Sequence, residues 1–218
     1  MTSQHIAQGL TAYVVLLFSL SFHESAHAWM ASKLGDDTAK QLGRVSLNPL
    51  VHIDPIGTVL FPLLQIFTGI PLLGWAKPTP YNPANFRPDV PLRKGHMLVA
   101  AAGPVSNVVL ALIFTFILFV LARLSLPSEA WRPVWTMMAI GIQLNVLLAL
   151  FNFVPIPPLD GSKVASYGLP GSVGDSYDRV VGPYGFLILM LLMMSGILGR
   201  ILAPIQGFIL DFLAGLVT

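Results

Sequence analysis

Long runs of apolar residues are the feature that most constrains how this chain of 218 residues can fold. A helix needs about 20 predominantly apolar residues to cross the ~30 Å hydrocarbon core of a bilayer. Runs near or above this length are found at 6–34, 96–124, 134–154 and 180–199. Only 10% of the residues are charged, against about 25% in a typical soluble domain. We therefore predict an all-α integral membrane protein with about four to six membrane-embedded helices.

The chain is predicted to form one polytopic domain, residues 1–218, with a core at 6–165 and additional C-terminal helices at 180–217. The apolar segment near 56–74 contains several Gly and Pro breaks. Broken backbone at membrane depth needs protein or water around it, so these breaks favour a re-entrant or interfacial segment over a full crossing. The Gly- and Ser-containing stretch 162–179 is predicted to be a loop.

Cysteine is absent, which excludes disulfides, thiolate metal sites and a cysteine nucleophile. The net charge is only +2, so the basic residues say more about membrane orientation than about nucleic acid. Residues 1–12 carry no Lys or Arg, and we expect no cleavable leader. The expected surroundings are a lipid bilayer, and no nucleic acid is expected as a partner.

The first apolar run contains the pattern H-E-x-x-H, within SFHESAHAW. On a helix, residues four apart lie on one face at about 5–6 Å, so His23 and His27 can bind one Zn²⁺ through ring nitrogens. Glu24 lies beside them and can take a proton from a metal-bound water. A charged residue at the centre of a membrane helix costs ~2.5–3.5 kcal/mol, which favours a functional site. A polar cluster that packs helices together is the alternative.

Asp160 is the strongest candidate for a third metal ligand, because catalytic zinc usually has three protein ligands and an open position. It follows the apolar run 134–154 in the sequence NFVPIPPLDG. The prolines fix an extended path, and Gly161 permits a sharp turn. From the residues alone, Asp160 can equally be a turn residue that caps the loop.

Together these motifs resemble the site-2 protease family of intramembrane zinc metalloproteases. The resemblance is carried by FHESAHAW at 22–29, AAGPVSN at 101–107 and NFVPIPPLDG at 152–161. The stretch GRVSLNPLVHIDPIGTVLFPLL at 43–64 also looks like the compact branch of that family. No segment is polar and long enough for a PDZ-like or CBS-like domain, which agrees with a compact form.

The resemblance implies that His23, His27 and Asp160 are ligands of one zinc ion per chain, with Glu24 as the catalytic base. It also implies that Asn152 contacts the substrate backbone or the developing oxyanion. The alternative for Asn152 is a residue that simply ends a helix.

Three further features stay open at this stage. Asn107 matches a residue that lines the core near the active site in the family, and a hydrogen bond between helices is its alternative. His52 can be a further zinc-shell residue, a gating ligand or an interfacial histidine. Segment 43–47 can form a short membrane-edge β element that holds an unwound peptide by backbone pairing, or an ordinary connection.

The topology decides whether the three ligands can meet. If 56–74 returns to the side on which it starts, Asp160 arrives on the same side as His23 and His27. Nine basic residues then fall on that side and three on the other, which makes the active-site side cytoplasmic. The nine are Lys33, Lys40, Arg44, Lys77, Arg87, Arg93, Lys94, Lys163 and Arg179, and the three are Arg123, Arg132 and Arg200.

The function predicted from these features is that of an intramembrane zinc-dependent endopeptidase in a prokaryotic plasma membrane. Its substrates would be membrane-anchored proteins or peptides, cleaved in or near their transmembrane segments. Both regulated proteolysis and clearance of signal peptides fit this prediction. The alternative is a metal-ion or proton transporter that uses the same buried cluster. A transporter would often show repeated halves with matching broken helices, and the sequence shows none.

Overall fold

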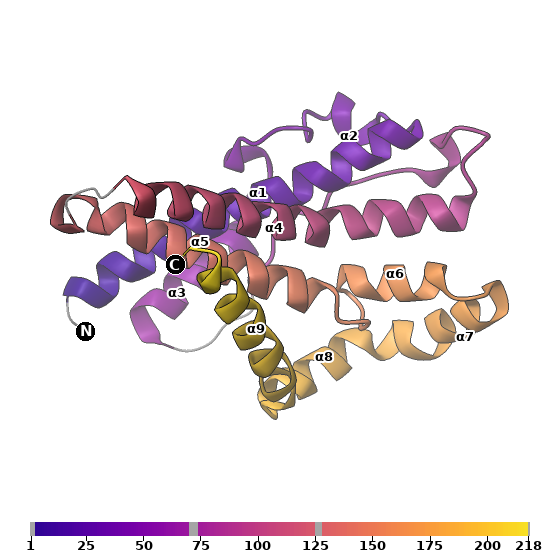
Figure 1. Ribbon diagram of the computed structural model, residues 1–218. Helices are drawn as coiled ribbons and strands as arrows, with labels where there is room; N and C mark the ends of the chain where they lie inside the picture. Colours follow the sequence, from indigo (N-terminus) through magenta and orange to yellow (C-terminus); the bar gives the residue numbers. More distant parts are fainter. Residues whose placement is uncertain (1–2, 70–73, 125–127, 218) are drawn as a thin grey trace.

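The computed structural model describes residues 3–69, 74–124 and 128–217. Within these ranges the regular structure is helical, and no strand is found (Figure 1). The α-helices are α1 (Ser3–Leu34), α2 (Thr38–Gln41), α3 (Phe61–Thr68), α4 (Leu92–Arg123), α5 (Ser128–Asn152), α6 (Asp160–Gly168), α7 (Gly171–Val181), α8 (Gly185–Met194) and α9 (Ile197–Gly215).

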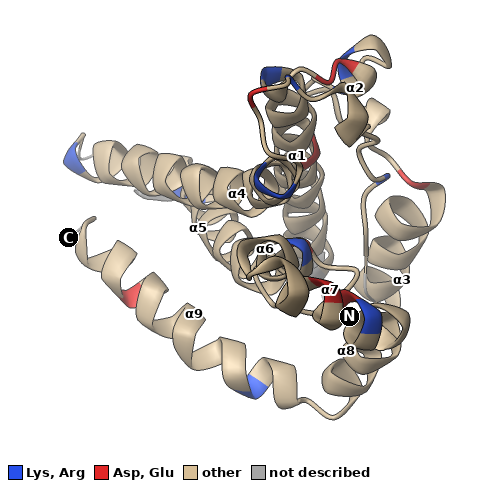
Figure 2. Ribbon diagram, turned by 90° about the vertical axis from the view of Figure 1, so that its right-hand side faces the viewer, with Lys and Arg blue, Asp and Glu red and all other residues tan. Residues whose placement is uncertain are grey.

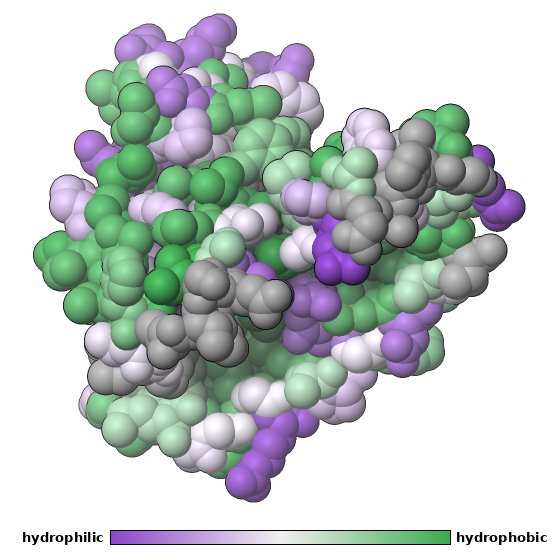
Figure 3. All heavy atoms as spheres, turned by 90° about the vertical axis from the view of Figure 1, so that its left-hand side faces the viewer, coloured by the Kyte–Doolittle hydropathy of each residue, from purple (hydrophilic) through white to green (hydrophobic). Residues whose placement is uncertain are grey.

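The protein is a multi-pass membrane protein, as predicted. In the described part of the chain, five helical stretches are long and apolar enough to cross a bilayer. They are Ile6–Leu34, Leu92–Arg123, Ala130–Asn152, Gly171–Met194 and Ile197–Gly215. Their large apolar side chains are often exposed, among them Phe116, Phe208 and Met194. Apolar residues accordingly cover much of the surface in Figure 3, as expected for contact with lipid.

The centre of the bundle is formed by α1, α4 and α5, which lie side by side. Leu110 and Phe114 of α4 pack against Met138 and Ile142 of α5 in the largest buried apolar cluster, which Leu213 of α9 completes. The loop before α4 is tied to the end of α1, because the Arg87 N–H donates to the Leu34 carbonyl at 2.8 Å. The start of α4 and the end of α1 therefore lie at the same end of the molecule.

The segment near 56–74 enters the bundle and returns, as predicted for a re-entrant piece. A π-helical turn at Pro55–Leu60 runs directly into α3. Ile66 of α3 lies beside the first part of α1, since a Cβ added at Gly9 would meet its Cγ2 at 3.1 Å. Residues 70–73 of this segment lie outside the described part of the chain. After them the chain is again beside the start of the segment, because the Trp75 N–H donates to the Gly57 carbonyl at 3.2 Å. Both ends of the segment therefore lie together. Since α4 then leads away from this end and α5 leads back, Asp160 lies at the same end of the molecule as α2.

Of the two alternatives for segment 43–47, the structure shows the ordinary connection and not the β element. These residues form an irregular connection without strand pairing. A strand needs a neighbouring ladder of backbone groups, and the polar groups here have other partners. The Ser46 carbonyl accepts from His52 Nε2 at 2.8 Å, and the Arg44 guanidinium donates to the Lys77 and Pro78 carbonyls.

The loop expected at 162–179 is wrong, since this stretch forms most of α6 and α7. Its small residues pack helices closely instead of interrupting them. Ser162 and Ser166 are buried, and a Cβ added at Gly174 would lie 2.1 Å from the Ser166 carbonyl oxygen. The Ser166 hydroxyl also donates to Asp178 Oδ2 at 2.6 Å, which joins the two helices.

Candidate metal centre

Two histidines of α1 and one aspartate of α6 meet inside the bundle. The Nε2 atoms of His23 and His27 are 3.1 Å apart. Asp160 Oδ2 lies 3.0 Å from His23 Nε2 and 3.2 Å from His27 Nε2. Both histidines are buried, and the Asp160 side chain is 16% exposed. Residues that are 137 positions apart in the sequence thus form one compact donor set.

The donor set fits a zinc ion. Zinc–nitrogen bonds of ~2.0–2.1 Å in a tetrahedral site place neighbouring donors about 3.3 Å apart, close to the separations of 3.0–3.2 Å observed here. Gly103 of α4 leaves the necessary space. A Cβ added there would stand 2.4 Å from His27 Nε2 and 2.5 Å from His23 Nε2. Two imidazoles and one carboxylate also match the ligand types of catalytic zinc sites, which keep one position open.

Each imidazole is oriented through its other ring nitrogen. His23 Nδ1–H donates to Asn107 Oδ1, and His27 Nδ1–H donates to the Val99 carbonyl, both at 2.7 Å. Both acceptors belong to α4, on either side of Pro104, whose missing N–H interrupts the helical hydrogen bonding at this turn. With the proton held on Nδ1, the Nε2 lone pair of each ring is left for a metal ion.

Asp160 is placed by a tightly packed turn between α5 and α6. It is the first residue of α6, where the helix dipole stabilises a negative charge. A Cβ added at Gly161 would lie 2.4 Å from the backbone of Phe153, so only glycine allows this close approach. The carboxylate form of Asp160 is the one that binds a cation.

Glu24 lies on the same stretch of α1 and is held by a strap, which we define as residues 74–82. The Thr79 N–H and hydroxyl approach Glu24 Oε2 at 2.9 and 2.8 Å. Both contacts use Oε2, which leaves Oε1 as the oxygen available to accept a proton. The strap is itself anchored, since the Lys77 N–H donates to the His52 carbonyl and the Asn82 N–H to Asp36 Oδ2.

The chain is similar in sequence to known proteins. "Putative zinc metalloprotease YwhC" of Bacillus subtilis is 37% identical over 199 residues, which cover 88% of this chain and 83% of that protein. The chain belongs to the site-2 protease-like family of zinc metalloproteases. Relatives named Rip2, from Mycolicibacterium smegmatis, and Rip3, from Mycobacterium tuberculosis, are each 29% identical to this protease. Their matches cover 90% and 80% of this chain, but 71% of Rip2 and only 35% of Rip3. No family profile and no solved structure matches the chain.

Membership of this family makes the chain a zinc metalloprotease. Within the described residues of this protease, the group able to hold a metal consists of His23, His27 and Asp160. His52 is outside this group. Its Nε2–H donates to the Ser46 carbonyl at 2.8 Å, and burial lowers its pKa, so the ring is neutral.

The two asparagines predicted from the motifs lie in different surroundings. Asn107 both contacts His23 and joins helices, because its Nδ2 donates to Asn145 Oδ1 at 2.9 Å. Asn152 is the last residue of α5, and its Nδ2 donates to the Leu148 carbonyl of its own helix at 3.0 Å. Contact between Asn152 and a substrate stays a prediction.

Sequence reasoning missed four contributors to the centre of this protease: the Val99 carbonyl, Gly103, Asn145 and Thr79. Asn145 gave a usable signal, since a lone asparagine inside an apolar helix is expensive unless it is bonded. Gly103 stands beside Pro104 in the motif AAGPVSN, where a close approach could have been suspected. Thr79 and the Val99 carbonyl carry no pattern that distinguishes them.

Proposed function

We propose that this protease is an intramembrane endopeptidase, which hydrolyses peptide bonds in or near the transmembrane segments of membrane-anchored proteins or peptides. Either regulated proteolysis or clearance of signal peptides would fit this activity. Zinc is the cofactor, one ion per chain, held by His23, His27 and Asp160.

The observation that carries the proposal is the depth of the donor set in a membrane helix. His23 lies 17 residues after Ile6 and 11 before Leu34, the ends of the first candidate span. At 1.5 Å per residue these separations are about 25 Å and about 16 Å along the helix. His23, Glu24 and His27 are all buried. A protease that acts at this depth meets its substrates inside the bilayer.

The roles of the residues follow from their contacts. A bound zinc ion would supply Lewis acidity and make a metal-bound water more acidic. Glu24 Oε1 is the proposed base that accepts the proton of the attacking water, while Thr79 holds Oε2. Asn107 and the Val99 carbonyl keep the Nε2 atoms directed at the metal. Asn152 is proposed to bind the backbone of the substrate, after release from the Leu148 carbonyl.

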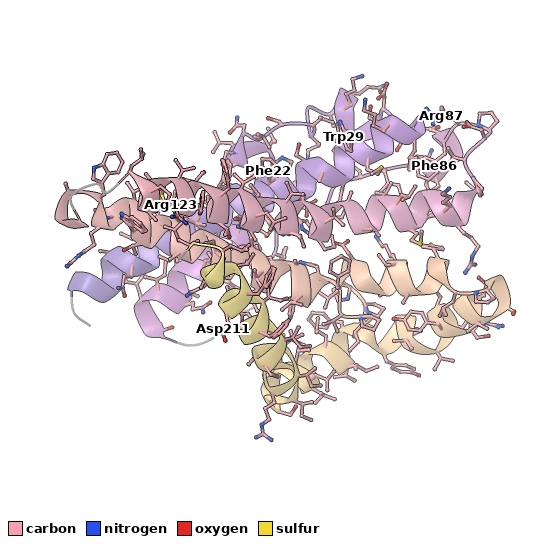
Figure 4. All side chains as sticks on the ribbon, viewed as in Figure 1. Phe22, Trp29, Phe86, Arg87, Arg123 and Asp211 are labelled. Atoms are coloured by element: carbon pink, nitrogen blue, oxygen red, sulfur yellow. The ribbon has the colours of Figure 1, made fainter. Side chains whose placement is uncertain are left out.

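The charge distribution supports a cytoplasmic location for the active-site end. Figure 2 looks toward the end where α1 ends and α4 begins, where most of the Lys and Arg residues lie, together with several Asp and Glu residues. In Figure 4, Arg87 lies at this end and Arg123 at the opposite end of α4. An excess of Lys and Arg marks cytoplasmic loops. Because the chain has no cysteine, single cysteines at the exposed residues Gln41 and Leu124 can report their sides by labelling of intact cells. Labelling of Gln41→Cys only after the cells are opened is expected, and labelling from outside would reject the orientation.

The decisive experiment is Glu24→Gln, with zinc content and cleavage of a synthetic transmembrane peptide measured on the same preparation. The variant keeps all three proposed ligands but removes the base, so we expect zinc to be retained and cleavage to fall at least ~100-fold. Asp211→Asn is the matched control, because it makes the same chemical change on α9. Undiminished cleavage by Glu24→Gln would reject the proposal, and metal transport without cleavage would favour a carrier.

A further inference from the structure

A chain of three fully buried polar side chains crosses the centre of the bundle behind the metal centre. Ser19 of α1, Asn107 of α4 and Asn145 of α5 each have 0% exposure. Asn107 Nδ2 donates to Asn145 Oδ1 at 2.9 Å. Asn145 Nδ2 approaches the Ser19 hydroxyl at 2.9 Å and the Gly141 carbonyl oxygen at 2.8 Å. The chain ends on His23 Nδ1, 2.7 Å from Asn107 Oδ1.

One backbone carbonyl fixes the direction of every bond in this chain. A carbonyl oxygen can only accept, so the Asn145 atom that faces Gly141 must be Nδ2. Asn145 Oδ1 then faces Asn107 and needs a donor, which only Asn107 Nδ2 can supply. Asn107 Oδ1 is thereby turned toward His23, and a carboxamide oxygen accepts. The Ser19 hydroxyl can donate or accept and does not influence the direction.

The direction of the chain determines which nitrogen of His23 carries the proton. A neutral imidazole has one N–H and one lone pair. An acceptor at Nδ1 requires the proton there, which leaves the lone pair on Nε2. That atom lies 3.0 Å from Asp160 Oδ2 and 3.1 Å from His27 Nε2. His27 does not depend on such a chain of hydrogen bonds. Its Nδ1 faces the Val99 carbonyl, which can only accept, so the proton is held on Nδ1 directly.

We propose that Asn145 is a positioning residue of the metal centre: acting through Asn107, it fixes the Nδ1–H tautomer of His23 and so presents Nε2 to the metal. The inference rests on the proposed role of His23 as a ligand. Residues behind metal ligands typically change metal affinity by about 10–100-fold when replaced. Asn145 acts one residue further away, and we expect an effect near the lower limit.

Two variants of similar size separate this role from simple packing. Asn145→Asp keeps an oxygen that accepts from Asn107 Nδ2, but it places a carboxyl group in the membrane interior beside the Gly141 carbonyl. We expect a lower melting temperature and a zinc affinity within about threefold of the parent protein. Asn145→Leu suits the apolar interior but offers no acceptor and leaves Asn107 Nδ2 without its partner, so we expect a melting temperature between those of Asn145→Asp and the parent, and about tenfold weaker zinc binding.

The test measures zinc affinity by chelator competition and the melting temperature of the metal-free protein, both in detergent. Thr115→Val is the control, since it removes a buried hydroxyl of α4 that donates to the Ala111 carbonyl and takes no part in the hydrogen bonds from Ser19 to His23. Its zinc affinity is expected to equal that of the parent. The proposed role of Asn145 is overturned if Asn145→Leu binds zinc as tightly as the parent. It is also overturned if zinc affinity simply follows melting temperature across the variants. His23→Ala tests the ligand assignment separately. An unchanged zinc affinity in this variant would show that His23 is not a ligand, which is a different failure from that of the role of Asn145.

Discussion

Gly103→Ala is the substitution that tests the shape of the metal centre most directly. In a helix, Ala is about 1 kcal/mol more favourable than Gly, so the change should support α4 wherever space allows. At this position the added Cβ would stand 2.4 Å from His27 Nε2 and 2.5 Å from His23 Nε2. These are the two proposed nitrogen ligands.

The size of the effect follows from the distances. To regain an ordinary contact of ~3.5 Å with the new Cβ, both nitrogens must move by about 1 Å. Metal–ligand distances tolerate only about ±0.2 Å. The rings cannot swing aside freely, because their Nδ1 atoms are held by Asn107 Oδ1 and the Val99 carbonyl at 2.7 Å. We therefore expect zinc affinity to fall at least ~100-fold, with cleavage lost in parallel.

The assay is chelator competition for zinc on the purified protein, beside the melting temperature without metal. Gly95→Ala is the matched control on the same helix, since its Cβ would meet the Phe86 ring at 2.5 Å and not the metal centre. This control is expected to lose stability through overpacking, typically ~1–3 kcal/mol, and to keep its zinc affinity. A Gly103→Ala protein that binds zinc within about threefold of the parent would refute the proposed geometry.

Further outcomes are expected at three other positions. Asp160→Asn should weaken zinc binding at least ~10-fold in chelator competition, because an amide is a poorer ligand than a carboxylate; unchanged affinity would remove Asp160 from the ligand set. Thr79→Val keeps the N–H that bonds Glu24 Oε2 but loses the hydroxyl, so zinc content should stay and kcat fall less than ~10-fold; a loss as large as that of Glu24→Gln would contradict this. Burial raises the pKa of Asp36, but bonds from Thr38, Asn85 and Asn82 outweigh it and hold the pKa below its usual value. The stability from Asp36 is thus present at neutral pH and lost as pH falls through the lowered pKa. Asp36→Ala should lower the melting temperature at pH 7 by roughly 4–8 °C, for a loss of about 2 kcal/mol, and the difference from the parent should shrink in acid.

The helices and the donor set were accessible from the sequence because both rest on strong local rules. Apolar length predicts spans directly, and an H-E-x-x-H pattern places two imidazoles on one helical face. Joining Asp160 to them required a topological step, namely that 56–74 returns. The Gly and Pro breaks indicated this return, and the bond between Trp75 and Gly57 agrees with it.

The failed predictions share a cause, which is that small and polar residues have several uses in a membrane protein. Gly174 and Ser166 suggested a loop, but they allow α6 and α7 to approach closely. Segment 43–47 left a β element open as one of two alternatives, but its polar groups are bonded to side chains and turns. Whether such a residue forms a loop or a close contact between helices depends on which residues face it across the bundle. A single sequence does not show which residues those are.

The same dependence explains why the surroundings of the metal centre escaped prediction. In water, the second nitrogen of a histidine can be satisfied by solvent. Inside a membrane the protein must supply the partner itself, since an unpaired polar group there is costly. His23 obtains it from Asn107 and, through it, from Asn145, while His27 obtains it from a carbonyl near Pro104. His27 is therefore correctly oriented only when α1 and α4 are both in place, and His23 requires α5 as well, so metal binding should report on the assembly of these three helices and not on α1 alone.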